Sequence, residues 1–396
     1  MKKVLIFSLA YYPNYIGGAE VAIKEITDRI PDIEFHMVTL RFDRTLPKVE
    51  KVGNMLVHRI GFTRLHPAIR DLKTFPLHYN KFLFQFLAAY TAQSLHRRYR
   101  YDAIWAMMAH ATGVPAALFK MRNPAVPFIL TLQEGDPPKT IERTMRPLWY
   151  FFSKAFTSAD IVQAISSFLG AWARRRGFRG PLEVIPNGVN TQLFSAHVSS
   201  TELRTRLGKK ESDVYLITTS RLVHKNAIDD VLRALALLPT HVQFLILGSG
   251  PDKEELMQLA EDLGVATRIQ WLDQVSHDAL PQYLQVADIF IRPSRSEGMG
   301  NSFIEAMAAG IPVIATQEGG IADFLFDAQR NPSVPATGWA VDVNAPEQIA
   351  HAVEHILAHP EEVTQTVTRA QAFVREKYDW KTVVAAMQER VFKAIL

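Results

Sequence analysis

The sequence predicts an α/β protein built from two doubly wound domains. Short apolar runs alternate with longer amphipathic segments along all 396 residues, which is the pattern of parallel strands joined by helices. The chain is also too long for one ordinary core and fits two domains of similar size. We place these Rossmann-like domains at residues 1–192 and 193–377, facing each other across a cleft. A helix over 378–396 is expected to pack back on the first domain.

Each strand is expected where β-branched or aromatic residues run into Gly, Pro, Ser or Asn. The polar residues 195–200 are expected to link the domains. The basic and apolar start of the chain could also be a short signal peptide, but the following Tyr-Tyr-Pro and Gly-Gly favour a buried first strand that leaves through a loop. The expected strands are 4–9, 35–40, 55–60, 103–107, 128–132, 161–164 and 182–185, then 214–219, 243–247, 268–272, 289–291 and 313–315.

The composition excludes several classes of protein. Cysteine is absent, so disulfides, thiolate nucleophiles and cysteine zinc sites are impossible. No apolar run approaches the roughly 20 residues that a membrane-spanning helix needs. A cytoplasmic protein is therefore expected.

Charge divides unevenly along the chain. Residues 1–190 carry 26 Lys and Arg against 14 Asp and Glu, whereas residues 191–396 carry 18 against 26. A basic first domain indicates an anionic acceptor or surface, although a chance distribution of solvated charge is the alternative. Basic clusters at 97–100 and 174–179 and an aromatic segment at 75–90 leave open a peripheral contact with anionic membrane, the alternative being helix ends and core.

Two glycine-rich loops follow expected strands, where doubly wound sheets bind ligands. Gly17 and Gly18 precede a helix, and Gly248 and Gly250 occupy a strand-to-helix turn. Small residues there let backbone N–H groups face an anion such as phosphate, although a tight turn alone would also select glycine. The second loop lacks the third glycine of a dinucleotide fingerprint, which argues against an NAD-dependent oxidoreductase.

The most specific segment is residues 293–315. Glu297 precedes a glycine-rich loop, and Glu305 lies about one turn inside a helix expected to begin near Asn301. A carboxylate can hold a sugar or ribose diol by accepting paired O–H bonds, while the N–H groups of Met299, Gly300 and Asn301 can face phosphate. The alternative is that both are ordinary acids at the start and on the face of a helix.

This segment resembles the donor-site signature of the family-four retaining glycosyltransferases of the GT-B fold, also described as glycosyl transferases group 1. The resemblance extends along the chain in order. Further matching segments are Tyr12-Pro13 with residues 17–20, the domain-junction motif at 184–190, the basic loop at 220–223, Gly319-Gly320, and the lead into the last helix at 378–380.

The resemblance implies a role for particular residues. Arg221 and Lys225 would stabilise the charge on the leaving nucleotide, and Glu297 would hold the donor sugar, which makes these three the expected catalytic residues. Glu305 would hold the ribose hydroxyls. The other donor-binding residues would be Gly18, Gly248, Gly250, Trp271, Val275, Gly298, Met299, Gly300, Asn301 and Ser302, and the acceptor-binding residues would be Gly17, Glu134 and Asp136.

The sequence departs from the family pattern at two positions. The family lysine five residues after the arginine is replaced by Asn226, and Lys225 lies one residue early, so it either reaches the same phosphate or is a solvated lysine. A histidine often found near the reacting sugar is replaced by Gln133 or Glu134. Glu134 or Asp136 could instead orient the acceptor hydroxyl, and simple loop capping is the alternative for each.

By this resemblance the protein is a retaining hexosyltransferase that uses a UDP- or GDP-linked sugar as co-substrate and needs neither a metal nor another cofactor. The resemblance implies that the acceptor would be a glycan, a lipid-linked sugar or a small molecule, in cell-envelope or exopolysaccharide synthesis. A sugar-nucleotide epimerase or hydrolase of the same fold and a non-catalytic sugar-nucleotide-binding protein are the alternatives. Nucleic-acid binding is not expected, because no recognition motif accompanies the basic residues.

Overall fold

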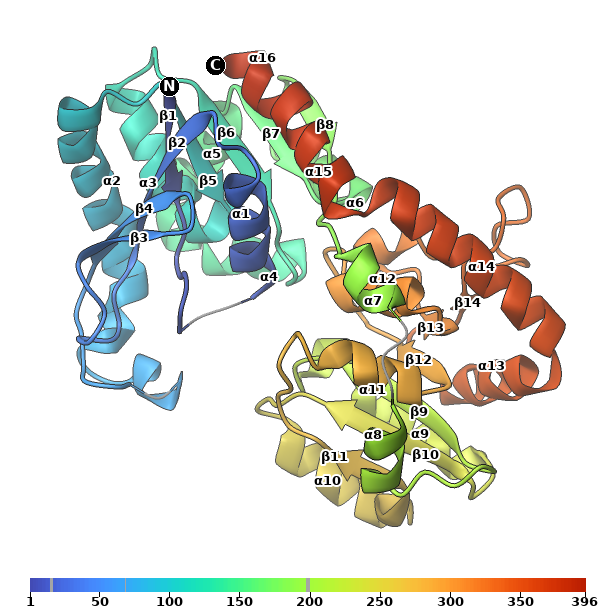
Figure 1. Ribbon diagram of the computed structural model, residues 1–396. Helices are drawn as coiled ribbons and strands as arrows, with labels where there is room; N and C mark the ends of the chain where they lie inside the picture. Colours follow the sequence, from blue (N-terminus) through green and yellow to red (C-terminus); the bar gives the residue numbers. More distant parts are fainter. Residues whose placement is uncertain (15–16, 68, 197–199) are drawn as a thin grey trace. The chain divides into compact units, whose positions relative to one another are not determined.

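The computed structural model describes residues 1–14, 17–67, 69–196 and 200–396, and it divides the chain into two compact units (Figure 1). Unit 1 comprises Met1–Asn187 with Trp380–Leu396, and unit 2 comprises Gly188–Asp379. The chain thus passes from unit 1 into unit 2 after Asn187, a few residues before the expected boundary at 192. Of the expected linker, residues 197–199 lie outside the described residues.

Unit 1 contains an eight-stranded sheet in the order β3-β4-β2-β1-β5-β6-β7-β8. Every neighbouring pair is parallel except β3 and β4, which form an antiparallel hairpin at one edge. The central strands are buried, as parallel strands covered on both faces must be. The strands are β1 (Lys2–Phe7), β2 (Ile33–Leu40), β3 (Val49–Val52), β4 (Met55–Ile60), β5 (Ala103–Met107), β6 (Phe128–Leu132), β7 (Ile161–Ala164) and β8 (Leu182–Val184).

Helices cover this sheet from both sides (Figure 1). Helix α3 packs against both α2 and α5, while α1 contacts the C-terminal helical segment. The helices are α1 (Gly18–Asp28), α2 (Asn80–Tyr99), α3 (Ala109–Arg122), α4 (Pro138–Thr144), α5 (Trp149–Thr157), α6 (Ser167–Arg175), α15 (Trp380–Ala386), the π-helical η7 (Met387–Phe392), α16 (Lys393–Ile395), and the short 3-10 helices η1 (Ile69–Lys73), η2 (Leu77–Tyr79) and η3 (Arg146–Leu148).

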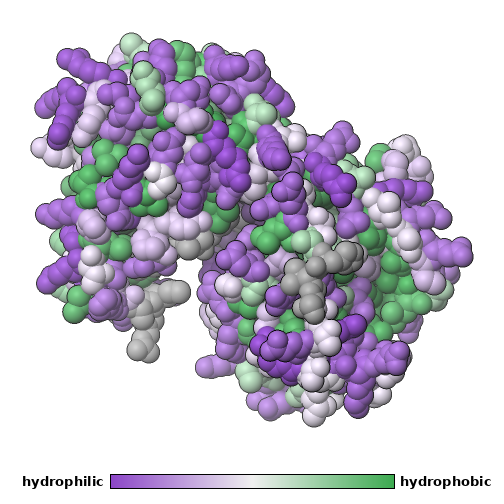
Figure 2. All heavy atoms as spheres, viewed as in Figure 1, coloured by the Kyte–Doolittle hydropathy of each residue, from purple (hydrophilic) through white to green (hydrophobic). Residues whose placement is uncertain are grey.

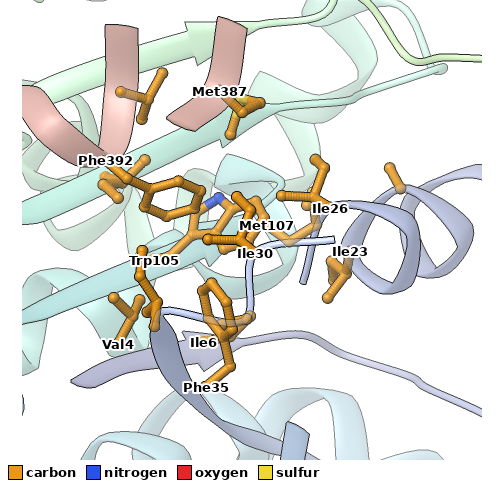
Figure 3. Packing of buried hydrophobic residues seen from close by; sticks show 14 of the residues in the cluster. Val4, Ile6, Ile23, Ile26, Ile30, Phe35, Trp105, Met107, Met387 and Phe392 are labelled. Atoms are coloured by element: carbon orange, nitrogen blue, oxygen red, sulfur yellow. The ribbon is translucent and has the colours of Figure 1, made fainter. Parts of the chain in front are cut away.

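The C-terminal segment forms part of the core of unit 1. Met387 and Phe392 are buried in the same cluster as Ile23, Phe35 and Trp105 (Figure 3). The ring of Phe392 lies edge-on to Trp105 at 5.4 Å between centroids and to Phe35 at 5.8 Å. These apolar contacts join the last residues of the chain to strands from its first half, because only burial on that sheet removes their side chains from water.

A buried chain of hydrogen bonds crosses four strands of the same sheet. Trp105 Nε1 donates to Thr131 Oγ1 at 2.7 Å, and Thr131 Oγ1 donates to Gln163 Oε1 at 2.7 Å. Gln163 Nε2 in turn donates to the Ile185 carbonyl at 2.5 Å. Because each of these bonds pairs a buried polar group, the network fixes the register of β5 to β8 without leaving a polar group unpaired along it.

Unit 2 contains a six-stranded parallel sheet in the order β11-β10-β9-β12-β13-β14. Helices flank this sheet as they do the sheet of unit 1 (Figure 1). The elements are β9 (Val214–Thr219), β10 (Val242–Leu247), β11 (Ile269–Trp271), β12 (Ile289–Arg292), β13 (Val313–Ala315), β14 (Trp339–Ala340), α7 (Thr191–Ser195), α8 (Thr201–Arg206), α9 (Ile228–Leu237), α10 (Lys253–Asp262), α11 (Leu280–Val286), α12 (Asn301–Ala309), α13 (Pro346–Ala358), α14 (Pro360–Lys377), and the 3-10 helices η4 (His224–Asn226), η5 (Ala266–Arg268) and η6 (Gly319–Asp323).

The sequence pattern finds every strand except β3 and β14. Strand β3 has no buried residue and therefore no apolar run, and it joins β4 through a two-residue turn in which Gly53 has a φ of +57°. Strand β14 is only two residues long. Both lie at sheet edges, where each pairs with a single neighbouring strand.

Within the residues that the structure describes, no helix combines the length and the apolar composition needed to cross a membrane. Hydrophilic side chains cover most of the face seen in Figure 2, with hydrophobic patches between them.

Two histidines lie side by side on strands β2 and β4 of unit 1. The rings of His36 and His58 are 5.7 Å apart, and Tyr99 contacts both of them. His58 is buried, its Nε2 has no hydrogen-bond partner, and burial together with the nearby His36 lowers its pKa to about 4. The folded protein therefore keeps His58 neutral at pH values where an exposed histidine is protonated.

This histidine should make stability depend on pH. In the unfolded chain His58 takes up a proton as the pH falls through about 6.5, whereas in the folded protein it does so only near pH 4. The contribution of His58 to the free energy of unfolding is therefore complete above pH 6.5 and is lost as the pH falls from 6.5 to 4. Between neutral pH and pH 4, we expect the wild-type protein to lose about 2 kcal/mol more unfolding free energy than His58→Phe. Urea titrations across this range measure the difference, and parallel curves for the two proteins would contradict it.

Candidate functional site

The predicted donor-site residues of unit 2 gather at the carboxyl edge of its sheet. They lie at the end of β11 and in the loops that follow β9, β10, β11 and β12, which are neighbours in the sheet order. A further loop, after β13, carries Gly319 and Gly320. In parallel sheets these loops surround the usual ligand position, so the sequence and the topology point to the same edge.

Two of the predicted donor-binding glycines let neighbouring loops touch. A Cβ on Gly248 would lie 1.9 Å from the Ser220 carbonyl oxygen, and one on Gly250 would lie 2.1 Å from that of Leu222. The Leu222 N–H also donates to the Ser249 carbonyl at 3.0 Å. Close packing of the loops after β9 and β10 is therefore enough to require both glycines, whatever else they contact.

Arg292, the last residue of β12, organises the centre of this edge. Its side chain is 7% exposed and donates to Glu297 Oε2 at 3.0 Å and to Ser302 Oγ at 2.9 Å. The guanidinium also lies over the ring of Phe303, 4.2 Å from its centroid. Burial lowers the pKa of Arg292 while the carboxylates of Glu297 and Glu305 raise it, and an arginine remains charged at neutral pH in either case.

The sequence analysis missed Arg292 because it ends an apolar strand with no motif to mark it. The available signal was a cation at the end of a buried strand, five residues before Glu297. A buried arginine requires a carboxylate partner, so the pair could have been suspected from the sequence.

Glu297 is held by its backbone as well as by its side chain. Its carbonyl accepts the Gly320 N–H at 3.0 Å, and a Cβ on Gly319, which has a φ of +63°, would lie 2.0 Å from that carbonyl oxygen. Its Oε1 accepts the N–H of Gly298 at 3.0 Å. The loops after β12 and β13 thereby fix a carboxylate that is 12% exposed.

Helix α12 begins directly behind this loop, at Asn301 as predicted. Gly300 precedes it with a φ of +88°, and a Cβ there would lie 2.6 Å from the Phe303 ring and 2.7 Å from Arg292. Gly300, the N-cap residue, makes no side-chain cap. Gly298 and Met299 are buried, and Asn301 and Ser302 are half-buried.

Glu305 lies one turn inside α12, and its Oε1 is 3.1 Å from His277 Nε2. The carboxylate is 13% exposed, whereas His277 is 54% exposed and packs against the ring of Phe194. His277 is a second residue that the sequence analysis missed, because a lone loop histidine carries no pattern. Val275 lies in the same loop, and Trp271, at the end of β11, is half-buried against the core of unit 2.

The loop after β9 carries the predicted cations. Arg221 is exposed and Lys225 is half-buried. Asn226, which takes the place of the family lysine, is 4% exposed, and its Nδ2 donates to the Arg221 carbonyl at 2.6 Å. Asn226 therefore shapes the loop and supplies no charge. The next residue, Ala227, has a φ of +55°.

Arg295 fixes this loop against the loop after β12. Its N–H donates to the Lys225 carbonyl at 2.7 Å, and its guanidinium donates to both carboxylate oxygens of Asp229 at 2.8 Å and to Asp230 at 2.9 Å. The hydrogen bonds to Asp229 raise the pKa of Arg295. Two carboxylates thus neutralise this cation. Arg221 and Lys225 are the cations that the sequence analysis assigned to the diphosphate.

The predicted acceptor residues belong to unit 1, at the carboxyl edge of its sheet. Glu134 follows β6 and is buried, and its Oε1 accepts the Ala109 N–H at 2.5 Å at the start of α3. The same oxygen lies 3.4 Å from His110 Nδ1. The carboxylate thus caps a helix whose own N-cap residue, Met108, makes no side-chain cap, and it favours the positive end of the helix dipole.

The remaining predicted residues of unit 1 lie at the surface. Asp136 is exposed after β6, and Gln133 donates to Asn187 Oδ1 at 2.7 Å. Gly17 and Gly18 are exposed at the start of α1, where the Gly17 N–H donates to Glu20 Oε2 at 2.8 Å. Burial raises the pKa of Glu20.

Comparison with known families accounts for both halves of the chain. Residues 16–193 match the model of Glycosyltransferase Family 4, and residues 199–373 match that of Glycosyl transferases group 1. Together these models span most of the sequence. The chain belongs to the group 1 and family 4 glycosyltransferases. Membership in these families agrees with the resemblance seen in residues 293–315.

Curated relatives are glycosyltransferases. A GDP-mannose-dependent alpha-(1-6)-phosphatidylinositol monomannoside mannosyltransferase of Mycobacterium tuberculosis is 32% identical over 244 residues, which are 58% of this chain. The match spans only 61% of that relative's length. An uncharacterized glycosyltransferase of Methanocaldococcus jannaschii is 24% identical over 96% of this chain and 95% of its own.

Solved structures of other proteins show the same fold. Sucrose-phosphate synthase of Thermosynechococcus elongatus has a TM-score of 0.82 at 20% identity and covers 100% of both chains. Anabaena HepE in complex with UDP-glucose has a TM-score of 0.78 at 22% identity, covering 99% of this chain and 100% of its own. The fold of this family member is therefore GT-B, with two parallel sheets.

Proposed function

We propose that this protein is a retaining, metal-independent glycosyltransferase that moves a hexose or N-acetylhexosamine from a nucleotide-diphosphate sugar to an acceptor. The arrangement at the carboxyl edge of unit 2 supports this proposal most strongly. Glu297 and Glu305 stand on either side of the start of α12, two carboxylates that can each accept paired hydroxyl hydrogens. A helix start between them favours an anion such as a phosphate.

In this proposal Arg221 and Lys225 neutralise the diphosphate as the nucleotide leaves. Fixed cations stabilise the developing charge without reorganising in the transition state, which is the work that a divalent metal does in other enzymes. Arg292 acts indirectly, because its side chain is buried and holds Glu297 in place. Glu305 binds the ribose hydroxyls, and His277 positions Glu305 through their 3.1 Å contact. Trp271 and Val275 are proposed to contact the base.

The relatives suggest which substrates to test first. The mycobacterial relative is named as GDP-mannose-dependent, and HepE was solved with UDP-glucose, so UDP- and GDP-sugars are the proposed donors. The name of the mycobacterial relative also includes a phosphatidylinositol monomannoside. A Bacillus subtilis relative that is 30% identical over 231 residues is named for teichuronic acid biosynthesis. A glycan or lipid-linked acceptor in envelope or exopolysaccharide synthesis is proposed on this ground, and a small molecule is the third acceptor class.

On the acceptor side, the helix cap changes what Glu134 can do. Its Oε1 already accepts the Ala109 N–H, so we assign it a positioning role through His110. Asp136 and Gly17, both exposed, are proposed to contact the acceptor directly. A retaining transfer in which the leaving phosphate takes the acceptor proton needs no protein nucleophile at this position.

Two alternatives make different predictions. An epimerase or hydrolase of the same fold would consume the sugar nucleotide with no acceptor present. A non-catalytic binding protein would bind it and release no product. An exposed Arg221 at this sheet edge would serve transfer, hydrolysis and binding alike, so the dependence of donor consumption on an acceptor is what distinguishes the three.

The central test is the stereochemistry and metal dependence of transfer. We expect thermal-shift screening of UDP-, GDP- and ADP-sugars to identify a donor, and that donor to be consumed only when a glycan or lipid-linked acceptor is added. Proton NMR of the product should show the anomeric configuration of the donor, and excess chelator should leave the rate unchanged. An inverted linkage, or activity lost to the chelator and restored by Mg²⁺, would refute the mechanism.

Glu305→Ala should weaken nucleotide binding. Losing charged hydrogen bonds to the ribose costs about 1.5–3 kcal/mol, which is roughly a ten- to hundredfold rise in the dissociation constant of UDP or GDP. The preference among donor sugars should not change, because Glu305 does not contact the sugar in this proposal. Isothermal titration measures the affinity, with the exposed Glu354→Ala on α13 as the control. Unchanged nucleotide affinity in Glu305→Ala would rule out the ribose role.

We also propose that unit 1 contacts anionic membrane at its periphery. Phe75 and Tyr90 are 70% and 77% exposed, and Phe82 and Phe86, on the same helix as Tyr90, are also exposed. A cavity of about 460 Å³ lies beside them between α2 and α3 and is lined by Phe86, Tyr90, Arg97 and Arg122 among others. Aromatic rings beside arginines match the interfacial region of a lipid bilayer, where rings insert and cations meet phosphate.

This contact should depend on both the rings and the lipid charge. We expect the protein to sediment with vesicles that contain anionic phospholipid at low salt, and less so at high salt. The double variant Phe82→Ser with Tyr90→Ser should reduce sedimentation several-fold. Leu237→Ser, at a position 56% exposed on α9 of unit 2, is the matched control. Absence of binding at low salt would refute the proposal.

A further inference from the structure

Two histidines and a glutamate converge at the corner between α13 and α14. His355 lies in the last turn of α13, His359 lies between the helices, and Glu362 lies in the first turn of α14. One ligand atom from each of the three lies within 4.8 Å of the others. None of these residues belongs to the candidate donor site, and the sequence analysis expected no metal anywhere in the chain.

The three side chains already contact one another. His355 Nε2 is 2.9 Å from Glu362 Oε2, and the rings of His355 and His359 are stacked with centroids 4.1 Å apart. His355 and Glu362 are 40% and 45% exposed, so an ion can reach them from solvent. A metal bound here would replace one hydrogen bond with coordinate bonds and would need no large movement of the helices.

A hydrogen bond to the backbone sets the tautomer of the His359 ring. Its Nδ1 lies 2.8 Å from the His355 carbonyl oxygen, which can only accept, so Nδ1 carries the hydrogen. The neutral ring then has its lone pair on Nε2. Metal-binding histidines commonly donate their second ring nitrogen to a carbonyl or carboxylate in this way, which fixes both the tautomer and the ring orientation.

The surroundings provide space and rigidity. A cavity of about 600 Å³ adjoins the corner, lined by His351, His355 and Glu362 among others, which leaves room for water on a bound ion. Ile356 is buried in the core of unit 2, and Val363 packs against that core, so both helices are anchored on either side of the corner.

We propose that His355, His359 and Glu362 form a Zn²⁺ site. Two imidazoles and one carboxylate are ligands that Zn²⁺ prefers, and three protein ligands leave a fourth position for water. The ion would join the end of α13 to the start of α14 and stabilise unit 2, since a metal that binds only the folded state shifts unfolding by mass action. This inference does not depend on the proposed transfer reaction.

Calorimetric titration of the untagged, metal-free protein with ZnCl₂ tests the site directly. We expect one saturable site per chain and a higher melting temperature with zinc. His359→Gln and Glu362→Gln should each weaken binding by at least about tenfold. His351→Ala, an exposed histidine one turn earlier on α13 and outside the cluster, should bind zinc as the wild-type protein does.

Co²⁺ gives a second readout that does not depend on stability. Titration with CoCl₂ should produce visible absorption bands of an imidazole-ligated ion, and these should be lost in His355→Gln. Circular dichroism of each metal-free variant confirms that it is folded. No saturable zinc binding by the wild-type protein, or an equal loss of affinity in His351→Ala, would overturn the proposal.

Discussion

The buried ion pair between Arg292 and Glu297 is the interaction on which the candidate donor site depends. A guanidinium that is 7% exposed cannot remain at the end of β12 without a carboxylate, so the following loop must fold back to supply one. The same arginine bonds Ser302 and lies over Phe303, which places the start of α12 beside the loop. One charge at a strand end therefore fixes a carboxylate, a loop and a helix start together.

A second arginine, Arg295, has a structural role that differs from the role proposed for Arg221. Arg295 is held by Asp229 and Asp230 and joins the loop after β12 to the loop after β9. The charge of Arg295 is therefore paired within the protein, whereas the side chain of Arg221 is exposed. Asn226 completes this arrangement by bonding the Arg221 carbonyl, so the residue that replaces the family lysine has become part of the loop's backbone support. The proposal for metal-free transfer consequently relies on Arg221 and Lys225.

Glycines and a helix cap show why a motif residue need not touch a ligand. Gly248 and Gly250 are required because a Cβ at either position would clash with a carbonyl oxygen of the neighbouring loop. Glu134 already accepts a hydrogen bond at the start of α3. These residues still shape the edge at which a substrate would bind. Family membership and the GT-B fold support a role in glycosyl transfer.

The sequence by itself determined the α/β class, nearly all the strands and the start of α12, because burial of apolar runs and the freedom of glycine act locally. It also determined the family, through residues 293–315. Only the tertiary structure decided which charges are paired. Glu305 meets His277, and Glu134 meets the start of α3, across 28 and 25 residues of sequence, and no local pattern encodes such contacts. The cluster of His355, His359 and Glu362 differs from these contacts, because its members are close in sequence. Even so, only the turn between α13 and α14 makes their side chains converge.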